Sequence, residues 1–160
     1  MRQTATTLDL PVPFSVGSGY ALLALAVLPE DGRFSVAADL AHLLGLPGPF
    51  LAKVLTALAQ EGILESQRGP GGGFRLARPA HCITVQDVVA AIEGGAALHG
   101  CLMRTAACRE HPCVLHHALV ELKAQTDQIL YQVTIRDLQI RHLRNLREQA
   151  EAKPALNIGA

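Results

Sequence analysis

The fold of this chain is decided by one glycine-rich stretch, Ser66-Gln67-Arg68-Gly69-Pro70-Gly71-Gly72-Gly73-Phe74-Arg75-Leu76-Ala77-Arg78. Glycine-rich loops that bind phosphate lead from a strand into a helix, and no helical pattern follows this one. Instead, two short apolar runs, Ile63-Leu64 and Phe74-Arg75-Leu76, flank a glycine–proline turn. This arrangement predicts a β-hairpin that carries Arg68 at its tip.

Two helices joined by a tight turn are predicted directly before the hairpin. Ser35 is a suitable N-cap for the first helix, whose apolar residues recur at helical spacing: Val36, Leu40, Leu43 and Leu44. Gly45 gives the backbone the freedom to turn, and Leu46 is expected to fill the space between the two helices. Pro47 or Pro49 begins the second helix and Gly62 ends it. The apolar face of that helix is formed by Phe50, Leu51, Val54, Leu55 and Leu58.

A helix pair followed by an arginine-bearing hairpin is typical of a winged helix-turn-helix domain, which binds DNA. The alternative is an ordinary helical hairpin within a globular core. The fold class expected is mainly α, with a small β-hairpin wing and a long C-terminal dimerisation helix. The residues predicted to lie at the DNA are Ser35, Gly48, Lys53, Arg68, Gly72, Gly73 and Arg75.

Three of the four cysteines lie close together, in the pattern Cys101-x6-Cys108-x4-Cys113-x2-His116. Pro112 is expected to open a helix, which places Cys113 in its first turn, where the positive end of the helix dipole favours a thiolate. His116 follows three residues later on the same helical face. A [2Fe–2S] cluster needs four protein ligands, and this set supplies three thiolates and one imidazole. His99, His111 and His117 are the alternatives to His116 as the source of the imidazole.

Other interpretations of the cysteines remain open. Structural zinc sites usually have cysteines two to four residues apart, which these spacings do not match. A thiol switch could pair Cys108 with Cys113 on oxidation, or the cysteines could be inert. Cys82 lies apart from the others and is expected to be a small buried hydrophobic residue. No nucleotide-binding loop, catalytic triad or carboxylate pair points to an enzyme.

The C-terminal part carries a long amphipathic pattern. Apolar residues recur near helical spacing at Leu115, Leu119, Leu122, Ile129 and Leu130. Thr134 and Asp137 resemble a capping box that starts a final helix, as Thr84 and Asp87 do earlier in the chain. So small a domain cannot bury the whole stripe, so we expect a homodimer; the alternative is that the helix folds back on its own core.

Taken in order, these motifs resemble the Rrf-two family of bacterial iron–sulfur regulators, which includes the IscR, NsrR and RirA types. The resemblance extends from about Ser18 to Leu138. It rests on Tyr20-Ala21-Leu22, Phe50-Leu51, the glycine-rich stretch, Ile83-Thr84-Val85-Gln86-Asp87-Val88-Val89, Ile92-Glu93-Gly94, the three cysteines, and Val133-Thr134-Ile135-Arg136-Asp137-Leu138.

The resemblance implies a role for individual residues. In the family three cysteines hold the cluster, and these match Cys101, Cys108 and Cys113; IscR-type members add a histidine that matches His116. NsrR-like members use a carboxylate ligand at the position that matches Gly19. Because glycine has no carboxylate, the resemblance favours a [2Fe–2S] cluster over a [4Fe–4S] cluster. Arg68 matches the family residue that enters the minor groove. Relatives often carry base-reading polar residues where this chain has Pro47 and Pro49, so their operator sequence is not transferable.

The resemblance also implies a dimer that binds a palindromic operator, with half-sites one DNA turn or a multiple of it apart. The expected organisation is a flexible N-terminal extension (1–13), the winged domain (14–93), a cluster-binding loop (94–113), dimerisation helices (114–150) and a flexible tail (151–160), with fraying expected from Arg141 onward. Whether the holo or the apo form binds DNA, and the signal sensed, are left open.

The composition agrees with a compact intracellular domain, but a balance of charges is unusual for a DNA-binding protein, whose affinity comes largely from neutralising phosphates. The 160 residues include 14 basic and 14 acidic side chains, so the formal net charge is zero. The balance is uneven, because residues 66–82 contain three arginines and no acid. The longest early apolar run, Tyr20 to Leu28, is too short to span a membrane, and we expect a cytoplasmic protein without a membrane partner. In that compartment thiols stay reduced, so clustered cysteines point to metal or redox chemistry.

Overall fold

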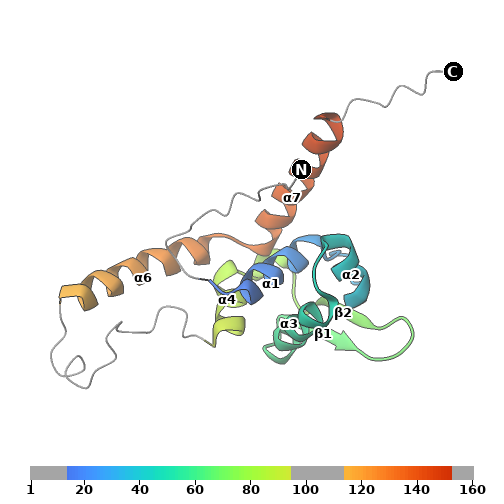
Figure 1. The fold of residues 1–160 in the computed structure, drawn as a ribbon, viewed down its shortest axis with the longest axis horizontal. Coiled ribbons are helices and arrows are strands. Elements are labelled where there is room, and N and C mark those ends of the chain that lie inside the picture. Colours follow the sequence, from blue (N-terminus) through green and yellow to red (C-terminus); the bar gives the residue numbers. More distant parts are fainter. Residues whose placement is uncertain (1–13, 95–113, 153–160) are drawn as a thin grey trace.

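The computed structural model describes residues 14–94 and 114–152 (Figure 1). These ranges form the helices α1 (Val16–Val27), α2 (Ala37–Leu44), α3 (Gly48–Gln60), α4 (Val85–Glu93), α6 (Val114–Gln132) and α7 (Ile135–Ala152), the strands β1 (Leu64–Gln67) and β2 (Gly73–Leu76), and a short 3-10 helix (Ala80–Cys82). The element order is that of a winged helix-turn-helix domain followed by two long helices, as the sequence predicts.

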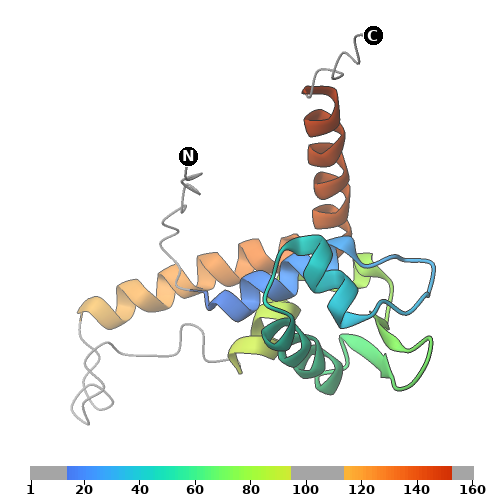
Figure 2. The same ribbon diagram turned by 45° about the vertical axis from the view of Figure 1, so that its right-hand side comes forward.

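One hydrophobic core holds the winged domain together. Its fully buried large side chains come from α1, α3, α4, the start of α7 and the residues that follow α3 and the 3-10 helix: Leu25, Leu51, Leu55, Leu58, Ile63, Ile83, Val88 and Ile135. α1 packs against α3, α4 and α7 and lies at the centre of the domain. Figures 1 and 2 show α6 and α7 leaving this unit in different directions, so that much of each helix lies outside the core.

The helix pair differs from the prediction at its start. α2 begins at Ala37, and no side chain caps it, so Ser35 is not its N-cap. The backbone of Ser35 instead pairs with Phe74 of the wing, with both N–H···O distances at 2.9 Å. That pairing keeps Ser35 in an extended bridge, one residue too early to cap the helix. Gly45 adopts the left-handed conformation predicted for the turn, with φ of 64°.

Some apolar side chains assigned to buried faces are exposed. Leu43 is 68% exposed and Val36 is 46% exposed, because α2 buries Leu40 and Ala41 instead. Phe50 is 43% exposed and its ring lies edge-on to Tyr20, with 5.5 Å between centroids. The hydrophobic spacing identified the two helices correctly but did not define which flank of each meets the core.

The wing is the predicted hairpin. β1 and β2 are antiparallel, in the register Leu64↔Leu76, Glu65↔Arg75, Ser66↔Phe74 and Gln67↔Gly73. Arg68 lies in the turn between them and is exposed. Cys82, expected to be buried, is exposed on the 3-10 helix that follows the wing.

The predicted capping boxes both form. The Thr84 hydroxyl accepts from the Asp87 N–H at the start of α4, and the Asp87 carboxylate accepts from the Thr84 N–H. Thr134 and Asp137 make the same exchange at the start of α7. α7 continues to Ala152, beyond the Arg141 at which fraying was expected. No helix within the described ranges is long and apolar enough to cross a membrane.

Candidate nucleic-acid interface and metal ligands

The outward face of α3 is the first part of the candidate DNA interface. Leu51, Val54, Leu55 and Leu58 anchor the opposite face of the helix in the core. Four exposed residues therefore share one stripe, at helical spacing: Pro49, Lys53, Thr56 and Gln60. The Thr56 hydroxyl donates to the Ala52 carbonyl at 2.8 Å and keeps its lone pairs free to accept. Lys53 is predicted from the sequence to lie at the DNA, whereas Thr56 and Gln60 are not, although their spacing from Lys53 places them on the same face.

The start of α3 is held against α2 by the turn between them. The Leu46 N–H donates to the Ala41 carbonyl at 2.9 Å, and the Leu46 side chain packs on the core as predicted. Gly48, the first residue of α3, is half-buried. The first backbone N–H groups of a helix have no acceptor within the helix. Such groups favour a phosphate, so this end of α3 is suited to face a nucleic-acid backbone.

Two glycines predicted to lie at the DNA have a definite structural role in the wing. A Cβ atom on Gly73 would lie 2.3 Å from the Ser35 carbonyl oxygen, and one on Gly72 would lie 2.2 Å from that of Gln67. No side chain fits at these distances. The glycines therefore let the hairpin close and let it meet the segment before α2, while Arg68 remains at the exposed tip.

The other two arginines of the wing region have acidic partners. The Arg75 guanidinium bonds one oxygen of Glu65 at 2.6 and 2.8 Å, and Arg78 bonds Asp87 at 3.2 Å. Residues 66–82 contain three arginines and no acid, but two of these arginines are paired with Glu65 and Asp87, which lie outside that range in the sequence. Arg68 and Lys53 are the exposed cations that these contacts leave on the wing tip and on α3.

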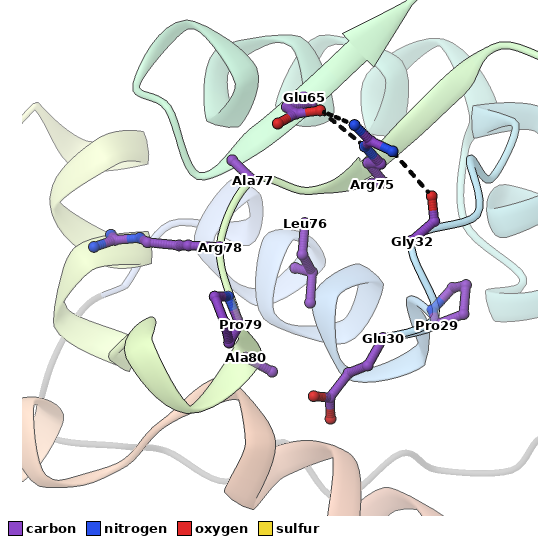
Figure 3. Close-up of a pocket in the computed structure, with 10 residues that line it drawn as sticks. All are labelled: Pro29, Glu30, Gly32, Glu65, Arg75, Leu76, Ala77, Arg78, Pro79 and Ala80. Atoms are coloured by element: carbon purple, nitrogen blue, oxygen red, sulfur yellow. Dashed lines mark hydrogen bonds and ion pairs between the residues drawn. The ribbon is translucent and has the colours of Figure 1, made fainter.

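A cavity of 330 Å³ lies behind the base of the wing (Figure 3). It is bounded by β2 and the residues after it, and by the turn that follows α1. Charged groups of both signs line it, among them Glu30, Glu65, Arg75 and Arg78. The cavity walls therefore join the wing and the α1–α2 connection, and Glu30 of that connection pairs with Arg136 of α7 at 3.1 Å.

Of the four predicted cluster ligands, only His116 lies within the described residues. Cys101, Cys108 and Cys113, together with the predicted loop 94–113 beyond Gly94, fall outside them. His116 is half-buried near the start of α6, and its ring meets the exposed His117 edge-on, with 6.0 Å between centroids. Within ranges 14–94 and 114–152, no three His, Cys, Asp or Glu side chains gather closely enough to hold a metal ion.

The donor set nevertheless suits an iron–sulfur cluster in its chemistry. Three thiolates and one imidazole carry the soft and borderline ligand atoms that such clusters use, and they supply the required four ligands. His116 lies in the first turn of α6, three residues after Cys113 in the chain. The described part of the set is therefore placed on the helix that adjoins the cysteine segment.

α6 and α7 meet the winged domain at a backbone joint. The Val85 N–H donates to the Val133 carbonyl and the Ile135 N–H donates to the Ile83 carbonyl, both at 2.8 Å. The buried Gln139 amide donates to the carbonyls of Leu25 and Leu28 at the end of α1, at 3.0 and 3.1 Å. The junction of the two long helices is thus fixed to both α4 and α1.

Large apolar side chains are exposed along both long helices. They are Val120, Leu122, Ile129 and Tyr131 on α6, and Ile140 and Leu143 on α7. Leu122 and Ile129 lie seven residues apart and therefore share one side of α6. They belong to the stripe that the sequence assigned to a dimer interface, and the core of a single chain does not cover them.

The wing, the helix pair and the exposed stripe of α3 define a winged helix-turn-helix DNA-binding regulator. The chain belongs to the Rrf2 family, described as iron-dependent transcriptional regulators, which it matches over residues 14–140. This confirms the family that the motifs resembled. A relative named "Putative HTH-type transcriptional regulator", from Aquifex aeolicus, is 36% identical over 129 residues, which cover 78% of this chain and 90% of the relative.

Solved structures support the same fold. T. potens IscR superposes with a TM-score of 0.64 at 22% identity and covers 92% of this chain and 95% of its own. CymR of B. subtilis, described as the global cysteine regulator, gives a TM-score of 0.63 at 20% identity, over 81% of this chain and 98% of its own. At these identities the two structures establish the architecture of the chain.

Proposed function

We propose that this protein is a homodimeric repressor whose affinity for DNA is controlled by an iron–sulfur cluster. The observation that carries the proposal is the course of α6. This helix bears the predicted ligand His116 near its start, and its far end runs into the joint with Ile83 and Val85. One rigid element therefore connects the predicted ligand set with the DNA-binding domain.

The DNA contacts follow from exposure and charge. Lys53, Thr56 and Gln60 on α3 face the major groove, and Arg68 at the wing tip enters the minor groove or binds a phosphate. Ser35 and Gly48 stand just before α2 and at the start of α3, where hydroxyl and backbone N–H groups bind phosphate. Gly72 and Gly73 act by shaping the wing. Two such units, related by a two-fold axis, would read a palindrome.

The cluster would be held by Cys101, Cys108, Cys113 and His116. A [2Fe–2S] cluster supplies a group that oxidants, nitric oxide or iron shortage can alter or remove. The ligands fix the start of α6, and the joint with α4 passes any change in its direction to the two winged domains. A coupling of about 1–3 kcal/mol between the ligand set and DNA would suffice for regulation.

Anaerobic purification tests this proposal. We expect an absorption spectrum with visible bands, and about two iron and two sulfide per chain, as a [2Fe–2S] cluster requires. His116→Ala should alter the bands, whereas the matched variant His117→Ala, which removes the exposed neighbouring imidazole, should leave them unchanged. About four irons per chain and a broad single band would replace the ligand assignment with that of a [4Fe–4S] cluster.

DNA binding is measured with the same preparations. The probe is a duplex selected from a randomised pool by the wild-type protein, compared between loaded and chelator-stripped protein. We expect the two forms to differ in affinity by about five- to 150-fold. Equal affinities would remove the cluster from the switch, and a colourless, iron-free protein would remove it from the molecule.

A second candidate is a winged-helix regulator that senses thiol oxidation without a cluster, or with zinc. The architecture shared with CymR favours it, since the CymR of Staphylococcus aureus has a structure described as its oxidized form. An iron-free protein whose DNA binding is lost on oxidation and restored by a thiol reductant would support this candidate. Oxidation would then act on the thiolates of Cys108 and Cys113.

A further inference from the structure

The Arg75 side chain joins three parts of the winged domain (Figure 3). Its Nε and Nη2 atoms donate to one Glu65 oxygen at 2.8 and 2.6 Å, across the hairpin. Its Nη1 atom donates to the Gly32 carbonyl at 3.3 Å. The guanidinium carbon also lies 4.6 Å from the centre of the Phe34 ring. One planar group thus ties β1 and β2 to the segment between α1 and α2.

Neighbouring contacts reinforce the same connection. Ser35, next to Phe34, pairs with Phe74, next to Arg75, through two backbone hydrogen bonds. Gly73 allows this close approach because no Cβ atom stands between the two backbones. A two-stranded hairpin is only marginally stable by itself, so its direction relative to α3 depends on such contacts. The backbone pairing ends at Ser35, whereas the Arg75 side chain extends the connection as far as Gly32.

We propose that Arg75 is a wing-positioning residue that acts on DNA binding through Arg68. It holds the hairpin against residues 32–35, and so sets where the Arg68 side chain at the tip reaches the duplex. This assigns Arg75 a different role from the direct DNA contact expected from the sequence. The inference rests on the proposed function, in which Arg68 contacts DNA.

The charge of Arg75 is already balanced by Glu65, whose side chain is 48% exposed beside it. This gives two opposite expectations for Glu65→Gln. If Arg75 bound phosphate while restrained by Glu65, removal of the negative charge would strengthen DNA binding. If Arg75 positions the wing, loss of the ion pair loosens the hairpin, and binding weakens although a negative charge has been removed.

The first experiment measures the affinity of full-length variants for the selected duplex at several salt concentrations. We expect Glu65→Gln to weaken binding about three- to tenfold, the effect of losing one charge-assisted hydrogen-bonded contact. Glu61→Gln is the matched control, because it removes an exposed carboxylate at the end of α3 without touching Arg75. It should leave binding unchanged or slightly stronger.

The second experiment is a double-mutant cycle with Arg68. Arg75→Lys keeps the charge, but a lysine ammonium lacks the planar fork that bonds Glu65 and Gly32 at once above the Phe34 ring. We expect it to weaken binding with an unchanged salt slope. Arg68→Ala should cost much less in the Arg75→Lys background than in wild type, since a misplaced wing has already lost that contact. Thermal unfolding of each variant verifies that the fold is retained.

The outcomes separate this inference from the proposed function. Three results together would make Arg75 a phosphate contact. Arg75→Lys would bind DNA like wild type, and Arg75→Gln would lower the salt slope of binding by about one. The loss of affinity in Arg75→Gln would also add to the loss in Arg68→Ala. That result overturns the positioning role and leaves the proposed function intact. If Arg68→Ala alone has no effect, the wing contact of the proposed function fails, and the role of Arg75 fails with it.

Discussion

Gly73 is the residue at which the wing comes closest to the rest of the winged domain. Its φ of 138° and the 2.3 Å that would separate a Cβ atom from the Ser35 carbonyl both exclude an ordinary side chain. The bridge between Ser35 and Phe74 therefore depends on this glycine. At this position the glycine of the glycine-rich stretch is required for close packing between the backbones of the wing and of Ser35.

Gly73→Ala should lower the free energy of unfolding by about 1–3 kcal/mol, because the backbone must shift or the bridge must break. Gly19→Ala is the control: Gly19 is helical, exposed and has nothing within 4 Å of the added Cβ. It should raise the free energy of unfolding by about 0.5–1 kcal/mol. Urea denaturation measures both, and equal stability of Gly73→Ala and wild type would contradict the packing argument.

Residues differ in how far the sequence predicts them. The hairpin, Gly45 and both Thr–Asp capping boxes are local patterns, and the structure contains each of them. Their local surroundings in the chain predict Ser35 as a helix cap and Cys82 as a core residue, and both predictions are wrong. Ser35 is in fact paired with a residue 39 positions later, and contacts at that separation leave no mark on local spacing.

The ends of helices α1 and α4 are joined by one carboxylate. Glu93, the last residue of α4, accepts from the Ser15 N–H at 3.0 Å and from the Ser18 hydroxyl at 2.6 Å, at the start of α1. The hydrogen bonds from Ser15 and Ser18 hold the pKa of Glu93 below its ordinary value. The positive end of the α1 dipole also favours the ionised form.

This lowered pKa makes the contact dependent on pH. Because the folded pKa lies below the unfolded one, the contribution to stability is complete above the ordinary glutamate range, near pH 4.3, and is lost as the pH falls below it. Glu93→Gln should therefore be less stable than wild type at neutral pH, by about 0.5–1 kcal/mol for a carboxylate partly open to solvent. The difference should shrink in acid.

Denaturation at about pH 7 and about pH 3 measures the effect, since the lower value lies about a unit below the ordinary glutamate pKa, toward the lowered pKa of the folded protein through which the contribution is lost. Glu61→Gln, which removes an exposed carboxylate elsewhere, should show little of it. A difference between Glu93→Gln and wild type that stays constant with pH would mean that the contact does not depend on ionisation.

Elements were easier to predict than their junctions. The helices and strands follow from periodicity and turn residues, and each one found in the sequence has a counterpart in the structure. The joint of Val133–Ile135 with Ile83–Val85 had no such signal, because it consists of backbone hydrogen bonds between segments about fifty residues apart in the chain. Such pairing leaves side-chain patterns unchanged, and only the tertiary structure reveals it.

In the whole molecule, the long helices expose more apolar surface than one domain can cover. On α6 the outward residues Gln125, Gln128 and Gln132 are polar, whereas Leu122 and Ile129 on the neighbouring flank are apolar and exposed. The α1–α7 contact made by Gln139 and the joint with α4 keep the helix from folding onto the core. This arrangement supports the homodimer in the proposed function, with the flank of α6 as its interface.

The double variant Leu122→Gln/Ile129→Gln should convert the protein from dimer to monomer without unfolding it, because both side chains lie outside the core of the chain. Sedimentation velocity measures the mass, and circular dichroism verifies the helical content.

Affinity for a palindromic duplex should fall by about a hundredfold or more, since each half-site is then bound without its neighbour. Affinity for a single half-site should remain that of wild type. Gln128→Ala, on the neighbouring polar flank of α6, serves as the control and should remain dimeric. A double variant that stays dimeric would move the interface away from this flank of α6, and the exposed Ile140 and Leu143 of α7 would be the next surface to test.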